Sequence, residues 1–230
     1  MFSRTVALIG EESLNKLKGK KVAVFGLGGV GGYAVEALAR SGIENFLLID
    51  NDTVNISNFN RQIIATNENL NKEKTLALKT RILSINKNAK VEIKNLFYLP
   101  QNSTEIDLST CHYVIDAVDT VSAKIEIILR AKELGIPVIS CMGTGGKLDP
   151  TLLTITDIYK TKNCPLSRVM RRELKKRGVE KLKVVYSLEE QTGNLIETEN
   201  LIKKAPPSMI FVPASAGLLL AKEVVLDLIK

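Results

Sequence analysis

The sequence predicts an α/β fold with a doubly wound, mostly parallel sheet and antiparallel C-terminal strands. Three observations support this prediction. Short apolar runs alternate with helix-like segments up to about residue 145, as in folds whose parallel strands are joined by helices. A glycine-rich turn separates the first run from the first helix-like segment. Beyond residue 150 the alternation changes to the pattern of a half-exposed strand.

The first part of the chain supplies the parallel strands and the helices between them. The predicted strands are Lys21–Phe25, Asn45–Ile49, Lys90–Ile93, Tyr113–Ala117 and Pro137–Cys141. The predicted helices are Gly29–Ser41, with Gly42 near its end, Asn71–Ile85, and a segment from about Thr120 to Leu134. This order of strand, helix and strand is typical of a parallel sheet.

The last part of the chain has a different pattern. The predicted elements are an antiparallel strand at Leu152–Ile158, a basic helix at Pro165–Arg177, a strand at Lys183–Ser187 and an apolar helix from Pro213 to Lys230. Gly178 stops the basic helix. Residues 189–207 are polar and predict a mobile loop.

Composition indicates one globular unit of residues 1–230, because 230 residues that are 45% apolar can bury a sizeable core. No apolar run approaches the roughly 20 residues that span a bilayer, and the start lacks the apolar core of a signal peptide. We therefore expect no membrane partner. Three widely spaced cysteines form neither a disulfide framework nor a CxxC metal pair, which favours the cytoplasm. The net charge of +7 is compatible with a polyanionic partner.

The glycine-rich turn predicts a phosphate site of the Rossmann-like kind. Its glycines are Gly26, Gly28, Gly29 and Gly31. They precede a helix whose N-terminal N–H groups and dipole attract phosphate, and they let the backbone approach a ligand closely. Asp50 ends the next strand about 20 residues on, where a carboxylate accepts hydrogen bonds from ribose hydroxyls. The structural alternative is a tight turn without a ligand.

A polar cluster after Asp50 shifts the predicted chemistry from hydride transfer to adenylation. Its members include Asp52, Asn58, Arg61 and Gln62. A dehydrogenase has no need of an arginine, an asparagine and a glutamine at this point. Cleavage between the α- and β-phosphates does need a cation, because charge develops on the departing pyrophosphate, and Arg61 can clamp that charge.

Two further residues complete the predicted catalytic site. Lys74 follows at the start of a helix and can add a second cation, and Asp119 ends a strand and can hold Mg²⁺. Each residue also has a structural interpretation, as a solvated loop arginine for Arg61, a surface lysine for Lys74 and a helix cap for Asp119. We favour the site because the carboxyl ends of strands in one sheet gather these groups.

The pattern GxGGxG, then LIDxDxVxxSNxNRQ, a lysine in the next helix and D-x-x-D before a further helix resembles the ThiF/MoeB/HesA superfamily of ATP-dependent adenylating enzymes. The resemblance covers roughly residues 1–145. It implies an ATP site, Mg²⁺, and a homodimer in which an N-terminal arginine, here Arg4, reaches into the partner's site. The implied roles are ribose binding by Asp50, phosphate binding by Asn58, Arg61 and Lys74, and Mg²⁺ binding by Asp119. Gln62 matches without a role beyond shaping the site.

Within the superfamily, the chain is similar to the branch that dehydrates threonylcarbamoyladenosine in tRNA. The similarity covers nearly the whole chain and includes the segments NRQI, GTGGKLDPT and CPLSRVMRRELKKRG. It implies that ATP activates the threonyl carboxylate of the modified adenosine next to the anticodon, and that the side chain then cyclises with loss of water. It leaves room for a sulfur-transfer accessory protein as a further partner.

Two alternatives stay open. The first is an adenylyltransferase for a ubiquitin-like sulfur carrier protein, although such enzymes usually carry paired CxxC zinc ligands, which this chain lacks. The second is a nucleotide-sensing or NAD-binding module without adenylation, for which Arg61 would be dispensable.

The basic helix predicts contact with the tRNA phosphate backbone. Its cations are Arg168, Arg171, Arg172, Lys175, Lys176 and Arg177. The alternative is a solvated charged face, which is the usual fate of such a run. Residues 143–146 follow a strand end, where they either line an acceptor pocket or form a turn. We interpret Cys164 and His112 as structural residues rather than as a nucleophile and a base.

Overall fold

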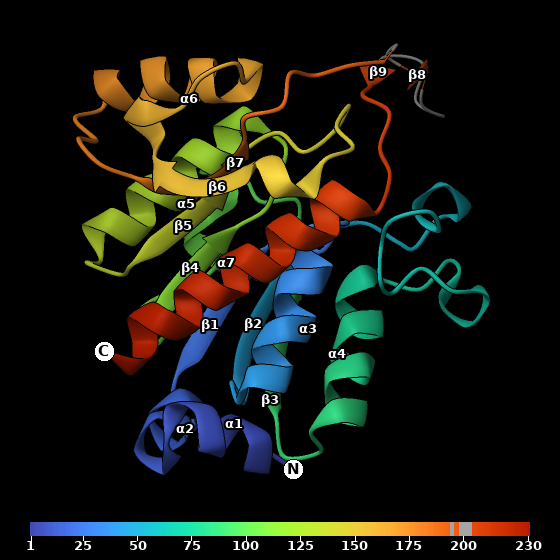
Figure 1. Ribbon diagram of the computed structural model, residues 1–230, viewed down its shortest axis with the longest axis vertical. Coiled ribbons are helices and arrows are strands. Elements are labelled where there is room, and N and C mark those ends of the chain that lie inside the picture. The colour runs from blue at the N-terminus through green and yellow to red at the C-terminus, as the bar shows by residue number, and fades with distance from the viewer. Residues whose placement is uncertain (194–195, 198–203) are drawn as a thin grey trace.

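A seven-stranded sheet forms the centre of the computed structural model, which describes residues 1–193, 196–197 and 204–230 (Figure 1). The strand order is β3-β2-β1-β4-β5-β7-β6, and all neighbouring strands are parallel except β6, which runs antiparallel to β7. The short strands β8 and β9 form a separate antiparallel pair. The predicted fold class is therefore confirmed.

The strands are β1 Lys21–Phe25, β2 Asn45–Asp50, β3 Lys90–Asn95, β4 Tyr113–Asp116, β5 Val138–Cys141, β6 Leu153–Asp157, β7 Lys183–Ser187, β8 Ile196–Glu197 and β9 Lys204–Ala205. The α-helices are α1 Ser3–Ile9, α2 Glu11–Lys18, α3 Gly31–Ser41, α4 Lys74–Ile85, α5 Val121–Glu133, α6 Pro165–Lys176 and α7 Phe211–Ile229. Short 3-10 helices are η1 Ile56–Asn58, η2 Asn67–Asn69, η3 Pro100–Glu105, η4 Pro150–Leu152 and η5 Ile158–Lys160.

Alternation along the strands divides the core between the two faces of the sheet. Val22 and Val24 of β1 pack in one apolar cluster with α3, α4 and α7, whereas Ala23 and Phe25 pack in a second cluster with α5. Figure 1 shows α3, α4 and α7 together over one face. A third cluster joins α5 to α6 through side chains such as Ile128 and Met170. The helix α6 is therefore fixed to the sheet through α5 and β7.

The strand order places a topological switch point between β1 and β4. The chain leaves β1 for α3 on one face and leaves β4 for α5 on the other. The loops that follow these two strands therefore diverge and leave a crevice at their carboxyl ends, where open α/β sheets bind ligands.

Several boundaries differ from the predicted ones. Helices α1 and α2 were not predicted, because α1 has no buried residue in the described structure and α2 buries only Leu14 and Leu17. Helix α3 begins at Gly31 and not at Gly29. Helix α7 begins at Phe211, so that Pro213 lies in its first turn, where a missing N–H is tolerated.

The loop predicted over residues 189–207 contains the paired strands β8 and β9. Residues 194–195 and 198–203 lie outside the described residues. None of the helices in the described ranges is both long and apolar enough to cross a membrane.

Candidate active site

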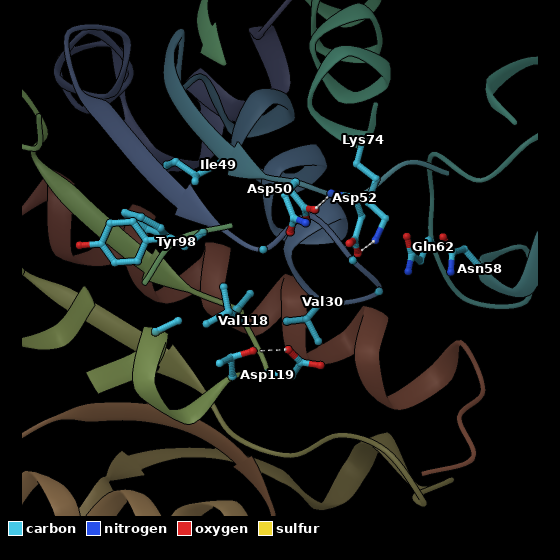
Figure 2. A pocket seen from close by; sticks show the side chains of 18 of the residues that line it. Val30, Ile49, Asp50, Asp52, Asn58, Gln62, Lys74, Tyr98, Val118 and Asp119 are labelled. Atoms are coloured by element: carbon cyan, nitrogen blue, oxygen red, sulfur yellow. Dashed lines mark hydrogen bonds and ion pairs between the residues drawn. The ribbon is translucent and has the colours of Figure 1, made fainter. Parts of the chain in front are cut away.

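A cavity of about 400 Å³ opens at the switch point, at the carboxyl ends of β1, β2 and β4 (Figure 2). Three loops form most of its wall, at residues 26–30, 50–62 and 117–120. The predicted site residues that line it are Gly26, Gly28, Gly29, Asp50, Asp52, Asn58, Arg61, Gln62, Lys74 and Asp119. The structure therefore gathers most of the residues that the sequence nominated for a nucleotide site.

The glycine turn combines residues that face the cavity with one that serves packing. Gly26 has φ +83°, and a Cβ there would lie 2.7 Å from the Ala117 carbonyl oxygen. A Cβ on Gly31 would lie 1.8 Å from the Gly26 carbonyl oxygen. Among the described residues, Gly31 is not part of the cavity wall, so its absent side chain lets α3 pack against the turn. Gly28 has room for a Cβ, with the nearest atom 3.7 Å away.

Asp50 ties the end of β2 to the glycine turn. Its Oδ2 accepts a hydrogen bond from the Leu27 N–H at 2.6 Å, and its Oδ1 accepts from the Asp52 N–H at 2.8 Å. Burial raises the pKa of this carboxyl, and the Lys74 charge and the two N–H groups offset part of that effect. Each carboxylate oxygen can accept more than one hydrogen bond. The fixed carboxylate can therefore also bind hydroxyl groups of a ligand.

Lys74 is a buried cation with one exposed partner. Its Nζ lies 2.7 Å from Asp52 Oδ2, and the lysine side chain is 5% exposed while that of Asp52 is 59% exposed. Figure 2 shows the two side chains pointing toward each other at the cavity. Because Asp52 is solvated, its hold on the ammonium is modest. An anionic ligand in the cavity can share or replace it.

Arg61 is the second cation of the wall. One terminal nitrogen, Nη1, donates to the Ser57 carbonyl oxygen at 2.8 Å and to Asn60 Oδ1 at 2.9 Å. Partial burial lowers the pKa of the guanidinium. Asn60 Nδ2 in turn donates to the Ser208 carbonyl oxygen at 2.8 Å, which brings the segment before α7 to the cavity.

Two buried amides complete the polar wall. Asn58 Oδ1 accepts from the Asn55 N–H at 3.1 Å and so fixes the short helix η1. Gln62 is 7% exposed, and its Oε1 is buried without a hydrogen-bond partner in the part of the chain that the structure describes. Buried polar atoms are normally paired. Gln62 is therefore a wall residue whose amide oxygen is left unsatisfied by the described protein groups.

The cavity also has an apolar side that the sequence did not predict. It is formed by Phe25, Ile49, Leu96, Tyr98, Val118 and Ala123. The rings of Phe25 and Tyr98 meet edge to face with centroids 4.8 Å apart. Burial raises the pKa of Tyr98 to about 12, so the phenol stays neutral. A flat apolar group such as a nucleobase fits this side, but strand-end hydrophobics look like ordinary core in a sequence.

Asp119 is, like Asp52, an exposed carboxylate of the wall, and its Oδ1 accepts from Thr120 Oγ1 at 3.3 Å. The residues that the structure describes contain no group of three or more His, Cys, Asp or Glu side chains placed to hold a metal. Mg²⁺ commonly binds one or two carboxylates and completes its shell with phosphate oxygens and water. Asp119 fits such a shared site, and it does not fit a site built from protein ligands alone.

Arg4 and the cations of α6 are not part of the cavity wall in the described structure. Arg4 is exposed on α1, which packs on α2 near the amino ends of the strands, at the opposite end of the sheet from the cavity (Figure 1). Thr144 does line the cavity. Cys164 is buried, and its Sγ accepts from the Ser167 N–H at 3.4 Å, so it caps α6.

The cations of α6 differ in how they are held. Arg171 Nη1 donates to the Thr161 carbonyl oxygen at 2.9 Å. Glu173 forms ion pairs with Arg172, Lys176 and Arg177. Arg168 and Lys175 are exposed and have no ion-pair partner within the described ranges.

The chain matches the profile of the ThiF family over residues 2–226. It is 40% identical to the tRNA threonylcarbamoyladenosine dehydratase of Bacillus subtilis, over all of this chain and 94% of that protein. A sulfur carrier protein ThiS adenylyltransferase of Escherichia coli is 29% identical over 64% of this chain and 60% of that protein.

The fold is similar to crystal structures of the Escherichia coli tRNA threonylcarbamoyladenosine dehydratase. The complex with AMP superposes with a TM-score of 0.90 at 32% identity, and the complex with ATP with a TM-score of 0.87 at 31% identity. Both comparisons cover 99% of this chain and 93% of the other.

The glycine turn supplies a matched pair of substitutions. Gly28→Ala should weaken ATP binding about 10-fold, because Gly28 lines the cavity, and should change stability by less than about 0.5 kcal/mol, because the added Cβ meets no atom closer than 3.7 Å. Gly31→Ala should destabilise the fold by about 3 kcal/mol or more, because its Cβ would overlap a carbonyl oxygen. Urea unfolding and titration calorimetry measure the two effects. Unchanged ATP affinity in Gly28→Ala would remove the turn from the phosphate site.

Proposed function

The chain belongs to the ThiF family, and we propose that it is an ATP-dependent tRNA threonylcarbamoyladenosine dehydratase. The observation that carries this function is likeness to such dehydratases along the whole chain, including the basic helix α6 and not the nucleotide cavity alone. Its substrates are ATP and a tRNA that carries the modified adenosine.

The cavity wall suggests how ATP is bound. The apolar side that contains Phe25 and Tyr98 takes the adenine, and Asp50 takes the ribose hydroxyls. The glycine turn, Arg61 and Lys74 take the phosphates, because helix N-termini and buried cations favour anions. Asn58 and Gln62 contribute amide groups to the same wall, and Asp52 releases Lys74 as it binds phosphate.

The reaction has two steps that share the cavity. In the first, an oxygen of the threonyl carboxylate attacks the α-phosphorus of ATP, the bond to the bridging oxygen breaks, and pyrophosphate leaves. Arg61 and Lys74 stabilise the charge that develops on this leaving group. In the second, a nucleophilic atom of the same modified nucleoside attacks the activated carbonyl carbon and gives up its proton, and AMP leaves with the former carboxylate oxygen. Holding both groups in one molecule favours ring closure.

Mg²⁺ belongs to the same proposal, with Asp119 as its protein ligand. When bound, the ion neutralises phosphate charge and orients the leaving group. The exposed carboxylate of Asp119 at the cavity wall supports this role, since its partner Thr120 leaves it accessible to a ligand.

We assign the tRNA surface to α6 and its C-terminal end. The exposed Arg168 and Lys175 are the best candidates for phosphate contacts, because no carboxylate in the described chain occupies them. Arg172, Lys176 and Arg177 add positive charge around Glu173, and Arg171 mainly joins α6 to η5.

We also propose a homodimer in which Arg4 completes the partner's site. Its support is the position of α1, which lies too far along the sheet for Arg4 to serve the cavity of its own chain (Figure 1). We further propose a sulfur-transfer accessory protein as a partner and a cytoplasmic location. The three free, buried cysteines support the cytoplasmic location.

The dehydratase function predicts a mass change in tRNA. With ATP, Mg²⁺ and tRNA bearing threonylcarbamoyladenosine, the modified nucleoside should lose one water, and Arg61→Ala should slow this at least about 100-fold because it removes a cation from the leaving group. Nucleoside mass spectrometry after digestion measures the loss. Unchanged mass with ATP still bound would favour an adenylyltransferase, and pyrophosphate exchange that requires a Gly-Gly-ended carrier protein would identify one.

The tRNA surface predicts a change in salt dependence. Arg168→Ala with Lys175→Ala should weaken tRNA binding and reduce the slope of log affinity against log salt by about 2, because about two phosphate contacts are lost. Filter binding at several salt concentrations measures the slope. Lys87→Ala, in an exposed loop before β3, is the control. Equal slopes in both variants would move the tRNA surface away from α6.

The shared site predicts complementation between two inactive variants. In a mixture of Arg4→Ala and Arg61→Ala chains, half of the dimers are mixed and each has one intact site, so activity should recover to about a quarter of the wild type. Refolding the chains together and assaying dehydration tests this. A mixture as inactive as its components would rule out contribution of Arg4 in trans.

A further inference from the structure

A fully buried ion pair lies behind the cavity. Lys124 Nζ is 2.9 Å from Asp116 Oδ2, and both side chains are 0% exposed. The Ser140 hydroxyl donates to the same carboxylate oxygen. Desolvation of two charges offsets much of their attraction, and apolar residues of similar size often serve stability as well. A contribution to stability alone therefore does not account for this ion pair.

The pair holds the backbone of two loops that reach the cavity. Lys124 Nζ also donates to the Val118 carbonyl oxygen at 3.1 Å and to the Cys141 carbonyl oxygen at 2.8 Å. Asp116 Oδ1 accepts from the Val118 N–H at 3.3 Å. Both main-chain polar groups of Val118 are therefore fixed by the pair.

These loops carry groups of the cavity wall. Val118 and its neighbour Asp119 line the cavity, and the chain after Cys141 leads to Thr144, which lines it as well. One buried ammonium thus connects the end of β4, the loop before α5 and the end of β5. A shift of this ammonium would move Asp119 and Thr144 relative to the phosphate-binding wall.

We propose that Lys124, with Asp116, is a positioning residue that sets the loop of Asp119 for Mg²⁺-assisted adenylation. The inference rests on the proposed function. The pair touches no ligand itself, because it lies behind the wall and is fully buried. Its removal should therefore lower kcat and the response to Mg²⁺ much more than the affinity for ATP without metal.

The test variant is Asp116→Asn with Lys124→Met, which removes both charges together and leaves no unpaired charge in the core. Asn keeps an acceptor for Ser140. The matched control is Glu36→Gln with Arg81→Met, which removes a 2.7 Å ion pair between α3 and α4 that is not part of the cavity wall. Thermal unfolding and circular dichroism identify the variants that fold.

We expect kcat for dehydration to fall at least about 30-fold in the test variant, because misplaced catalytic groups slow the reaction. Affinity for ATP without metal should change less than about 3-fold, and the control should keep both values. The gain in ATP affinity on adding Mg²⁺ should shrink as it does in Asp119→Ala. Adding Asp119→Ala to the test variant should cause no further loss, because both changes act on one contact.

A folded test variant with the wild-type kcat and Mg²⁺ response would overturn the proposal, as would an equal loss of kcat in the control. If wild-type protein dehydrates no tRNA, the proposed function fails, and the Mg²⁺-dependent ATP affinities decide the positioning role alone. If the Met variant does not fold, Asp116→Asn with Lys124→Gln replaces it. We expect the same fall in kcat and in the Mg²⁺ response, and wild-type values in this folded variant would equally overturn the proposal.

Discussion

The site depends on how closely three stretches of backbone meet after β1. No side chain fits at Gly26 or Gly31, because a Cβ would lie 2.7 Å from the Ala117 carbonyl oxygen in the first case and 1.8 Å from the Gly26 carbonyl oxygen in the second. The start of α3 therefore lies directly over the ends of β1 and β4, where its dipole favours an anion. Asp50 adds the end of β2 through its 2.6 Å bond from the Leu27 N–H. One turn thus fixes the relative positions of the start of α3, the Asp50 carboxylate and the loop that carries Asp119.

The lysines around the cavity are held in two different ways, and the difference separates binding from positioning. Lys74 has one exposed carboxylate partner, so a phosphate can compete for its ammonium. Lys124 has a buried carboxylate and two carbonyl oxygens as partners, and nothing in solution can reach it. The same residue type is therefore open to a competing anion at the start of α4 and fully enclosed by protein partners in α5. Burial and the number of partners, and not charge, distinguish the two roles.

The sequence predicted the sheet and the polar part of the cavity, since both depend on local patterns. The strand β7 has the predicted bounds, and the glycine turn and Asp50 reach the predicted end of the sheet. The side chains that were missed depend on tertiary contacts. From the sequence alone, Tyr98 cannot be distinguished from a residue of the hydrophobic core, because its place beside the cavity depends on the fold. From the sequence alone, Lys124 resembles a surface residue of a helix. Its partners come from two separate segments, residues 116–118 and the end of β5 at Cys141.

The basic helix α6 shows why a run of cations in a sequence does not by itself identify the side chains that contact a polyanion. Ion pairs with Arg177, Lys176 and Arg172 lower the pKa of Glu173 to about 2, so this carboxylate stays ionised and occupies those cations. Long-range attraction for a polyanion depends on net charge, which stays positive with six cations around one carboxylate. Direct contact with a polyanion instead requires cationic side chains that are not already paired with a carboxylate of the protein. Because α6 packs against α5, which begins directly after the Asp119 loop, such contacts would be made on a surface rigidly joined to the cavity.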